Sequence, residues 1–353
     1  MNRLQELVTK YAARLNLHEL AIGVRNAKSG EPVFAASGQH FDTRVSAETP
    51  FFMASTTKLF ATAIILQLVD EAKLTLDTRM TDLLDAETLA GLHHFKGRDY
   101  VPELTVRHLL AHTSGLADYF EQKPKSGGAA YAEDLLEGHD RTFSESDILD
   151  WVRTRLEPKF APGTPGKALY SDTNFQLLGL IITKLDATSL VEAVQKRVAE
   201  PLSLKSTGLF EANRPNAFGD VLPFRNGPKV LDIPNAIQST RLDGAGVSTA
   251  AELLTFIQAF FEGHLFDKAH FENMKDWRRI FFPLQNGTGI MRFKLPWFFS
   301  PFRPMPELWG HSGISGAFAY YCPEREVYLA GTINQAADRA LPYRFMLEAL
   351  GAA

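Results

Sequence analysis

The stretch Phe51-Phe-Met-Ala-Ser55-Thr-Thr-Lys58-Leu-Phe-Ala-Thr-Ala-Ile-Ile-Leu66 places a serine and a lysine three residues apart at the start of an apolar helix. Helical neighbours at this spacing share a face, so the amine of Lys58 can reach the hydroxyl of Ser55. A serine needs such a base before it can attack at neutral pH. Lys58 can serve only when neutral, and burial against an apolar wall favours the neutral amine. Taken alone, the spacing fits a serine N-cap followed by a surface lysine better, so other motifs must decide.

Working outward from this helix, apolar residues alternate near both ends of the chain. Leu20, Ile22 and Val24 precede a turn-rich segment at 26–30, and a second alternating run follows at 32–37. A similar pair lies at 317–322 and 327–334 around a short turn, and a helix is expected over 336–350. Both pairs predict β-hairpins. Strands at both ends predict one sheet assembled from distant segments.

The middle of the chain has a different pattern. Helical periodicity is expected over 59–74, 144–156 and 174–185, and Gly/Pro-rich breakers lie at 123–128 and 160–166. We therefore expect an α/β fold, with an antiparallel sheet flanked by helices, formed by both chain ends, and an inserted mainly helical lobe. The predicted boundaries are 1–60 and 236–353 for the α/β lobe and 61–235 for the helical lobe, with the active site in the cleft between them.

Composition excludes several classes of protein. The 353 residues carry 37 Lys plus Arg against 41 Asp plus Glu, a net charge of −4, so no nucleic acid partner is expected. No apolar run is long enough for a secretory signal or a membrane span, which predicts a cytoplasmic protein without a membrane partner. A single cysteine, Cys322, excludes an internal disulfide framework and is expected to be a small core residue.

Two further segments accompany the Ser55 helix. Gly166-Lys-Ala-Leu-Tyr170-Ser-Asp172-Thr-Asn174 follows a Pro/Gly loop, and Trp309-Gly310-His311-Ser312-Gly313-Ile314-Ser315-Gly316 leads into a strand. The order S-x-x-K, then a tyrosine motif, then H-x-G resembles the serine β-lactamase-like, penicillin-recognising hydrolases. Segments at 109–116, 200–207 and 244–249 resemble the branch of class C β-lactamases, D-peptidases and related carboxylesterases. The likeness runs in order from about residue 20 to 335.

The resemblance implies a role for each matching residue. Ser55 would be acylated by an ester, amide or lactam carbonyl, and Tyr170 would act with Lys58 as a proton shuttle. A nearby cation would make the phenol of Tyr170 easier to ionise, so either Tyr170 or Lys58 would be the base. The backbone N–H groups of Ser55 and Ile314 would form the oxyanion hole. Gly313, in the H-x-G motif, would lie at the substrate.

Two residues depart from the family pattern, and both are expected near the substrate. Asp172 stands where asparagine is usual, and either pairs with Lys58, which favours Tyr170 as the base, or caps the following helix. His311 replaces the lysine of K-T-G. Because histidine is mostly neutral at pH 7, this change weakens the case for a specialised β-lactamase.

Other candidate residues have weaker support. His108 and His112 are four apart, but no H-E-x-x-H motif is present, so no metal site is expected. The aromatic, proline-rich segment 293–304 would either wall an apolar acyl pocket or pack on its own lobe. Asn334 and Arg339 are candidates for the substrate end of the cleft, and a surface arginine on a helix is the simpler interpretation of Arg339.

These observations predict a cofactor-free serine hydrolase that acts through an acyl-enzyme on small carboxylic esters. The alternatives are a D-amino-acid peptidase or amidase, a weak β-lactamase, and a catalytically silent scaffold or binding protein of the same fold. Retention of Ser55, Lys58 and Tyr170 argues against the scaffold, and the sequence leaves the oligomeric state open.

Overall fold

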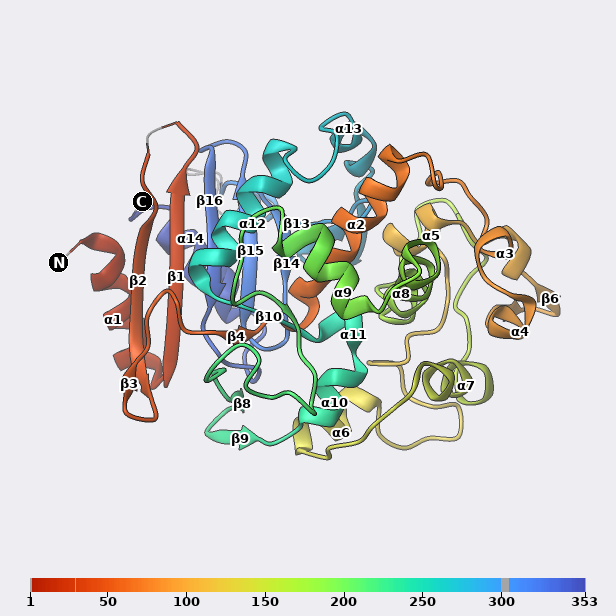
Figure 1. Ribbon diagram of the computed structural model, residues 1–353, viewed down its shortest axis with the longest axis horizontal. Helices are drawn as coiled ribbons and strands as arrows, with labels where there is room; N and C mark the ends of the chain where they lie inside the picture. The colour runs from red at the N-terminus through yellow and green to blue at the C-terminus, as the bar shows by residue number, and fades with distance from the viewer. Residues whose placement is uncertain (1, 29, 300–304, 353) are drawn as a thin grey trace.

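A computed structural model describes residues 2–28, 30–299 and 305–352. Its main feature is a nine-stranded antiparallel sheet in the order β11-β12-β13-β14-β15-β16-β1-β2-β3 (Figure 1). The strands are β1 (Glu19–Asn26), β2 (Val33–His40), β3 (Thr43–Arg44), β11 (Arg278–Phe281), β12 (Leu284–Asn286), β13 (Met291–Phe293), β14 (Leu308–Ser312), β15 (Ala317–Cys322) and β16 (Val327–Thr332). The antiparallel sheet and its flanking helices confirm the predicted fold class.

The two predicted hairpins meet at the centre of the sheet. β1 pairs with β2 through Val24 opposite Val33, and with β16 through Ala21 opposite Thr332. The first six residues of β1 are buried without alternation. This continuous burial arises because helices cover both faces of the sheet, so residues on either side of the strand are shielded from solvent.

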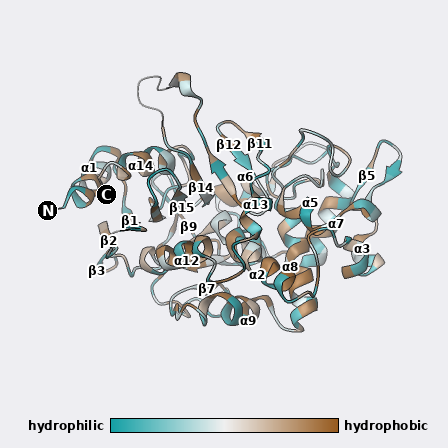
Figure 2. Ribbon diagram, turned by 90° about the horizontal axis from the view of Figure 1, so that it is seen from above, coloured by the Kyte–Doolittle hydropathy of each residue, from teal (hydrophilic) through white to brown (hydrophobic). Residues whose placement is uncertain are grey.

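Helices cover both faces of the sheet (Figure 2). One face carries α1 (Arg3–Leu15) and α14 (Leu341–Ala349), whose Tyr11 and Phe345 rings meet edge to face with centroids 5.0 Å apart. The other face carries α12 (Ala250–Glu262), and α2 (Lys58–Asp70) lies beyond it. The final helix was expected from residue 336 but begins at Leu341. Pro342 lies in its first turn, where proline is favoured because the missing N–H would have no partner there.

Most remaining helices surround α2 and α8 (Thr173–Asp186), which pack against each other and are buried along most of their length. An apolar residue on nearly every side is typical of a helix inside a core. The other α-helices are α3 (Met80–Leu83), α4 (Ala86–Leu89), α5 (Val106–Leu110), α6 (Tyr131–Glu137), α7 (Glu145–Arg155), α9 (Leu190–Val194), α10 (Pro234–Ser239), α11 (Arg241–Gly244) and α13 (His270–Met274).

Short strands complete the fold around the helices. The strands β4 (Phe51–Phe52), β10 (Gly246–Ser248) and β7 (Gly208–Leu209) form a small sheet beside the start of α2. Two hairpins are formed by β5 (His94–Phe95) with β6 (Arg98–Asp99) and by β8 (Phe224–Asn226) with β9 (Lys229–Leu231). Short 3₁₀ turns lie at η1 (Ala54–Thr57), η2 (Val101–Glu103) and η4 (Trp297–Phe299), and a π-turn lies at η3 (Gln195–Ala199).

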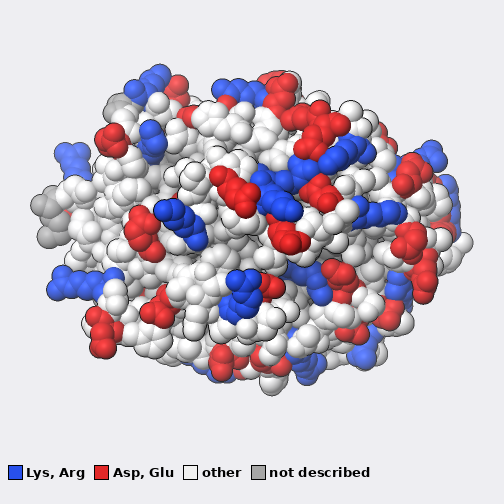
Figure 3. Space-filling view, in the orientation of Figure 1, with Lys and Arg blue, Asp and Glu red and all other residues white. Residues whose placement is uncertain are grey.

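The surface is mixed in charge. Acidic and basic side chains are interspersed over the face in view (Figure 3). Cys322 is buried and unpaired in β15. Of the described helices, none has the length and apolar character needed to cross a bilayer.

Candidate active site

Ser55 lies in a strained turn where β4 leads into α2. The preceding Ala54 has a φ of +45°, a left-handed conformation that is unfavourable for alanine. A hydrogen bond to β10 stabilises the turn: the N–H of Met53 donates to the carbonyl of Gly246 at 2.7 Å. Strain of this kind often marks a functional position, and here it presents the Ser55 side chain at the N-terminal end of the helix.

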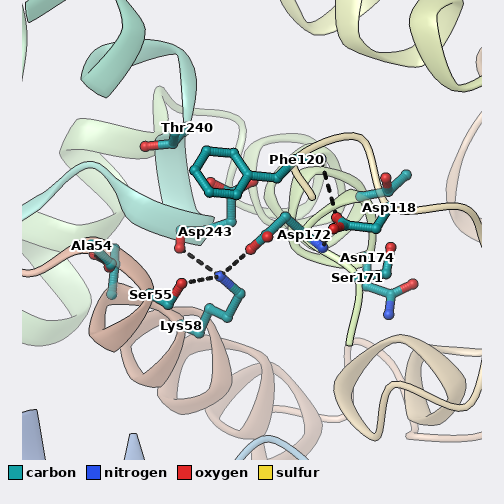
Figure 4. Close-up of polar contacts among 12 residues, drawn as sticks. Ala54, Ser55, Lys58, Asp118, Phe120, Ser171, Asp172, Asn174, Thr240 and Asp243 are labelled. Atoms are coloured by element: carbon teal, nitrogen blue, oxygen red, sulfur yellow. Dashed lines mark hydrogen bonds and ion pairs between the residues drawn. The ribbon is translucent and has the colours of Figure 1, made fainter. Parts of the chain in front are cut away.

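Lys58 is fully buried directly below Ser55, and its ammonium has three acceptors (Figure 4). It donates to the hydroxyl of Ser55 at 3.2 Å and to the backbone carbonyl of Asp243 at 2.6 Å, and it forms an ion pair with Asp172. Three donors thus meet three acceptors. In this resting arrangement Lys58 gives a hydrogen bond to Ser55 rather than accepting one.

Asp172 resolves the alternatives left open by the sequence. Although it occupies the N-cap position of α8, its side chain makes no capping hydrogen bond and pairs with Lys58 instead. Burial raises the pKa of Asp172, and the neighbouring Lys58 charge opposes that rise. The backbone N–H of Asp172 donates to the carboxyl of Asp118 at 2.8 Å, and burial raises the pKa of Asp118 to about 8.

Asp118 and Asp243 are the neighbours that the sequence analysis missed. The carboxyl of Asp243 accepts hydrogen bonds from the Tyr119 hydroxyl at 2.9 Å and from the Gln176 amide at 3.0 Å. Burial, with the added charge of Asp172, raises the pKa of Asp243 well above its ordinary value. Their positions beside family-like segments, two residues after 109–116 and just before 244–249, were the available signal.

Tyr170 is partly buried next to Lys58 and Ser55, and its hydroxyl is inaccessible to solvent. The amine of Lys58 lies 5.2 Å from the centre of its ring, and no described residue forms a hydrogen bond of good geometry with its hydroxyl. Burial and the charge of Asp172 raise the pKa of Tyr170 well above 10, and the nearby Ser55 hydroxyl only partly offsets the rise. These effects favour the protonated phenol, and which of Lys58 and Tyr170 is the base stays a prediction.

His112 fixes the orientation of Tyr170. The two rings stack with centroids 4.5 Å apart, and Nδ1 of His112 accepts from the N–H of Ser171 at 3.0 Å. Burial and the charge on Lys58 lower the pKa of His112 well below its ordinary value, so the ring is neutral. His108 instead caps the start of α5, where its Nδ1 accepts a hydrogen bond from the backbone N–H of Thr105 at 3.3 Å.

The backbone N–H of Ile314 lies beside the Ser55 turn. Gly313 donates to the carbonyl of Ala317 at 2.8 Å, and a Cβ at Gly313 would come within 2.1 Å of the carbonyl oxygen of Met53. Only glycine permits this approach. Within the described residues, no acceptor is bonded to the N–H of Ile314, which leaves that donor free for an oxyanion.

His311 lies behind Tyr170 and lines neither of the cavities that meet at Ser55. It is 2% exposed, and its ring centre is 6.1 Å from that of Tyr170. Burial, helped by the charge on Lys58, lowers the pKa of His311 to about 3. Burial therefore explains why His311 is neutral, as the sequence predicts. Because His311 lines neither cavity, the geometry does not favour direct contact with substrate.

Two cavities meet at Ser55 and Ile314. The helix-side cavity is lined by Ala54, Ser55, Phe120, Leu135, Asp172, Phe224, Ile237, Thr240, Asp243, Gly244 and Ile314. The sheet-side cavity is lined by Ser55, Glu121, Tyr170, Phe281, Leu284, Met291, Ser312, Gly313, Ile314, Arg339, Pro342 and Tyr343.

Three residues or segments named from the sequence take different positions. Arg339 lies before α14 rather than on a helix, and it pairs with Glu121 at the wall of the sheet-side cavity. Asn334 is buried away from the site, where it donates to Glu19 at 3.0 Å. In segment 293–304, residues 300–304 lie outside the described residues, and Trp297 is 74% exposed. The aromatic side chains that line the sheet-side cavity come from Tyr170, Phe281 and Tyr343 instead.

The one group of metal-type side chains among the described residues lies away from this site. Asp134, Glu137 and His139, at the end of α6, have ligand atoms within 4.8 Å of one another. Two of the three are exposed, and Asp134 already pairs with Arg141 at 3.3 Å.

Known proteins of similar sequence and structure are named as hydrolases in some cases and as acyltransferases in others. The chain is 26% identical over 236 residues to esterase EstB of Burkholderia gladioli, covering 66% of this chain and 53% of that protein. The D-stereospecific amidohydrolase of Streptomyces sp. superimposes with a TM-score of 0.75 at 24% identity, covering 98% of this chain and 97% of that one. The D-amino acid amidase of Ochrobactrum anthropi SV3, in complex with L-phenylalanine, gives a TM-score of 0.77 at 22% identity, covering 99% and 97%.

These likenesses differ in what they show. The two solved structures establish the fold, and the chain spans about half the length of the curated relatives it matches. The model of the Beta-lactamase family matches residues 4–353, so nearly all of the chain is covered. The chain therefore belongs to the Beta-lactamase family.

Proposed function

We propose that this chain is a serine hydrolase that cleaves small carboxylic esters through an acyl-enzyme on Ser55. The observation that carries the proposal is the 3.2 Å contact between the amine of Lys58 and the hydroxyl of Ser55, at the place where two cavities meet. A serine paired with a buried lysine, and open to a cavity, is the arrangement that nucleophilic catalysis needs. We propose Ser55, Lys58 and Tyr170 as the catalytic residues.

The first chemical step requires a neutral amine. Asp172, whose pKa is raised by burial, pairs with Lys58 and is the nearest group that can take a proton from its amine. The amine then removes the proton of Ser55 as its oxygen attacks the substrate carbonyl. Tyr170 holds its proton and would give it to the leaving oxygen, which makes Lys58 the base and Tyr170 the acid.

The same groups act in reverse during deacylation. After the leaving group departs, Tyr170 has lost its proton and can accept one from an incoming water. The hydroxide equivalent attacks the acyl carbonyl, and the proton on Lys58 returns to Ser55. In both steps the negative charge on the carbonyl oxygen would be held by the N–H groups of Ser55 and Ile314.

Ester hydrolysis is favoured over the alternatives by two considerations. Esterase EstB is a relative by sequence over two-thirds of this chain, and the neutral, buried His311 supplies no fixed positive charge for the carboxylate of a β-lactam or peptide. Amide hydrolysis is the second candidate, because two structural neighbours are named as hydrolysing D-amino acid derivatives. We propose small-molecule esters or amides as the partners, and a cytoplasmic location.

A direct test compares wild type with Ser55→Ala on p-nitrophenyl acyl esters, D-alanyl peptides and a chromogenic cephalosporin. Hydrolysis of the esters that disappears in Ser55→Ala, while the melting temperature stays the same, supports the proposal. Unchanged turnover in the variant would refute it. No turnover of any substrate and no fluorophosphonate adduct in the wild type would favour a non-catalytic scaffold.

A further inference from the structure

Four aromatic side chains are exposed together near β11, the edge strand of the large sheet. Phe281 and Phe282, where β11 turns into β12, are 49% and 54% exposed. Trp297 and Phe298, in the 3₁₀ turn η4, are 74% and 62% exposed. We call these four residues the aromatic surface. An exposed apolar cluster of this kind marks a place where a protein binds a partner.

A groove connects the two segments that carry the aromatic surface. It has a volume of about 460 Å³, and both Phe282 and Trp297 line it. Pro283, Leu295 and Pro296 supply the rest of its apolar wall. The rings of the two segments therefore belong to one continuous surface.

The same groove carries an excess of positive charge. Arg279, Arg292 and Lys294 line it, and none of the described residues that line it is acidic. Glu307 lies close by and pairs with Arg292 at 3.5 Å and with Lys294 at 3.1 Å, so one carboxylate offsets one of the three cations. Arg279 is exposed on β11 and forms no ion pair with a described residue. This local excess contrasts with the net charge of −4 of the whole chain.

The aromatic surface also adjoins the proposed active site. Phe281 lines the sheet-side cavity that contains Ser55, and Leu284 lines both that cavity and the groove. Since Leu284 is only 4% exposed, its side chain forms a wall shared by the two. A partner bound at the aromatic surface would therefore lie beside the cavity in which esters are proposed to react.

We propose that the aromatic surface binds the interfacial region of an anionic lipid bilayer. Tryptophan and phenylalanine rings enter this region readily, and each arginine or lysine near it is attracted to the negative surface. A bilayer fits better than a folded protein, because rings that project from two separate segments can be surrounded by a fluid without matching pockets.

This contact goes beyond the proposed function, since it assigns a second binding partner to the chain. It also needs no spanning helix, because two short segments supply the apolar side chains. A scan of the sequence for long apolar runs therefore does not test it.

The test is cosedimentation of the full chain with lipid vesicles. One set contains phosphatidylcholine alone, and the other is an equal mixture of phosphatidylcholine and phosphatidylglycerol, each at low and high salt. Trp297→Ala and Arg279→Gln change the proposed contact. The matched controls lie at the opposite edge of the sheet: Phe41→Ala, which alters a ring that is also 74% exposed, and Arg44→Gln, on the edge strand β3.

Wild type is expected to bind the mixed vesicles, to bind phosphatidylcholine alone more weakly, and to be released by high salt. Trp297→Ala should weaken binding to the mixed vesicles about tenfold or more, because the buried area of the ring is lost. Arg279→Gln should weaken it about fivefold. Both controls should remain within about twofold of wild type.

Two results would overturn the proposal: no binding of wild type to either set of vesicles, or equal loss of binding in Phe41→Ala and Trp297→Ala. A dimer that forms without lipid and is lost in Trp297→Ala would also overturn it, and would assign the surface to a second copy of this chain. Because cosedimentation measures no turnover, its outcome does not depend on whether Ser55 hydrolyses esters.

Discussion

The side chains of Lys58 and Asp172 form an ion pair while they are 0% and 5% exposed. A buried pair of this kind adds little net stability, yet loss of one partner leaves a charge without compensation. Here the same ammonium also bonds to Ser55 at 3.2 Å. The pair therefore couples the protonation of a buried carboxyl to the state of the proposed nucleophile, and this coupling leads to the first prediction.

Asp172→Asn is expected to lower the rate of hydrolysis. The substitution keeps an oxygen acceptor beside Lys58 but removes the carboxylate that takes the proton of Lys58 in the proposed first step. The value of kcat/KM should therefore fall about 10²–10⁴-fold. The measurement is a pH–rate profile for wild type and variant between pH 4 and 9, and coincident profiles would show that the charge of Asp172 has no catalytic effect.

Tyr170→Phe is expected to separate activity from stability. Removing an acid catalyst typically costs about 10²–10⁴-fold in rate. Because no described residue forms a hydrogen bond of good geometry with the hydroxyl of Tyr170, the free energy of unfolding should be unchanged or should rise slightly.

The matched control for that prediction is Tyr119→Phe. The hydroxyl of Tyr119 donates to Asp243 at 2.9 Å, so its loss should lower the free energy of unfolding by about 1–3 kcal/mol. Urea unfolding and ester kinetics on both variants test the pair. A Tyr170→Phe protein that retains full activity would contradict the proposed role of this residue.

Ile314→Pro tests the oxyanion hole. Proline has no N–H, so the variant lacks one of the two proposed donors to the carbonyl oxygen, and kcat should fall about 10²–10³-fold. Ile314→Val keeps the N–H and a similar apolar side chain and should stay within a few-fold of wild type. Equal activity of the two variants, with matching melting temperatures, would exclude a role for this N–H.

His311 is expected to contribute to acid unfolding. Its pKa is about 3 in the folded protein and about 6.5 in an unfolded chain. The unfolded state therefore binds the extra proton between these values, and stability falls as the pH is lowered through this window. At pH 4 the loss from His311 alone is about 3 kcal/mol.

The measurement is urea unfolding of wild type and His311→Gln at pH 7 and pH 4. Buried groups whose pKa does not depend on His311, such as Asp118, titrate in both proteins and so cancel in the comparison. The variant should lose about 3 kcal/mol less stability than wild type over this interval. An equal loss in the two proteins would show that His311 is not held neutral by its surroundings.

Much of the fold could be predicted from local sequence patterns. Alternating residues at Leu20, Ile22 and Val24 and at 317–322 define strands whose pairing is set by short turns, and the S-x-x-K spacing follows from helix geometry. The division into lobes near residues 60 and 236 remains a prediction.

The rest depends on contacts between distant residues. The carbonyl of Asp243 contacts Lys58, 185 residues away in the sequence. His112 stacks on Tyr170, 58 residues away, and Phe281 lines the same cavity as Ser55. No local periodicity encodes such contacts. The raised pKa of Tyr170 likewise depends on its burial and on the charge of Asp172, which no local pattern shows.

The most direct test of the central claim is to trap the acyl-enzyme. Wild-type protein is mixed with a p-nitrophenyl ester, quenched in acid within one turnover, and analysed by intact and peptide mass spectrometry, with Ser55→Ala as the control. The account predicts one acyl group per chain, located on Ser55 and absent from the variant. Turnover without any adduct, or an acyl group on another residue that persists in Ser55→Ala, would contradict it.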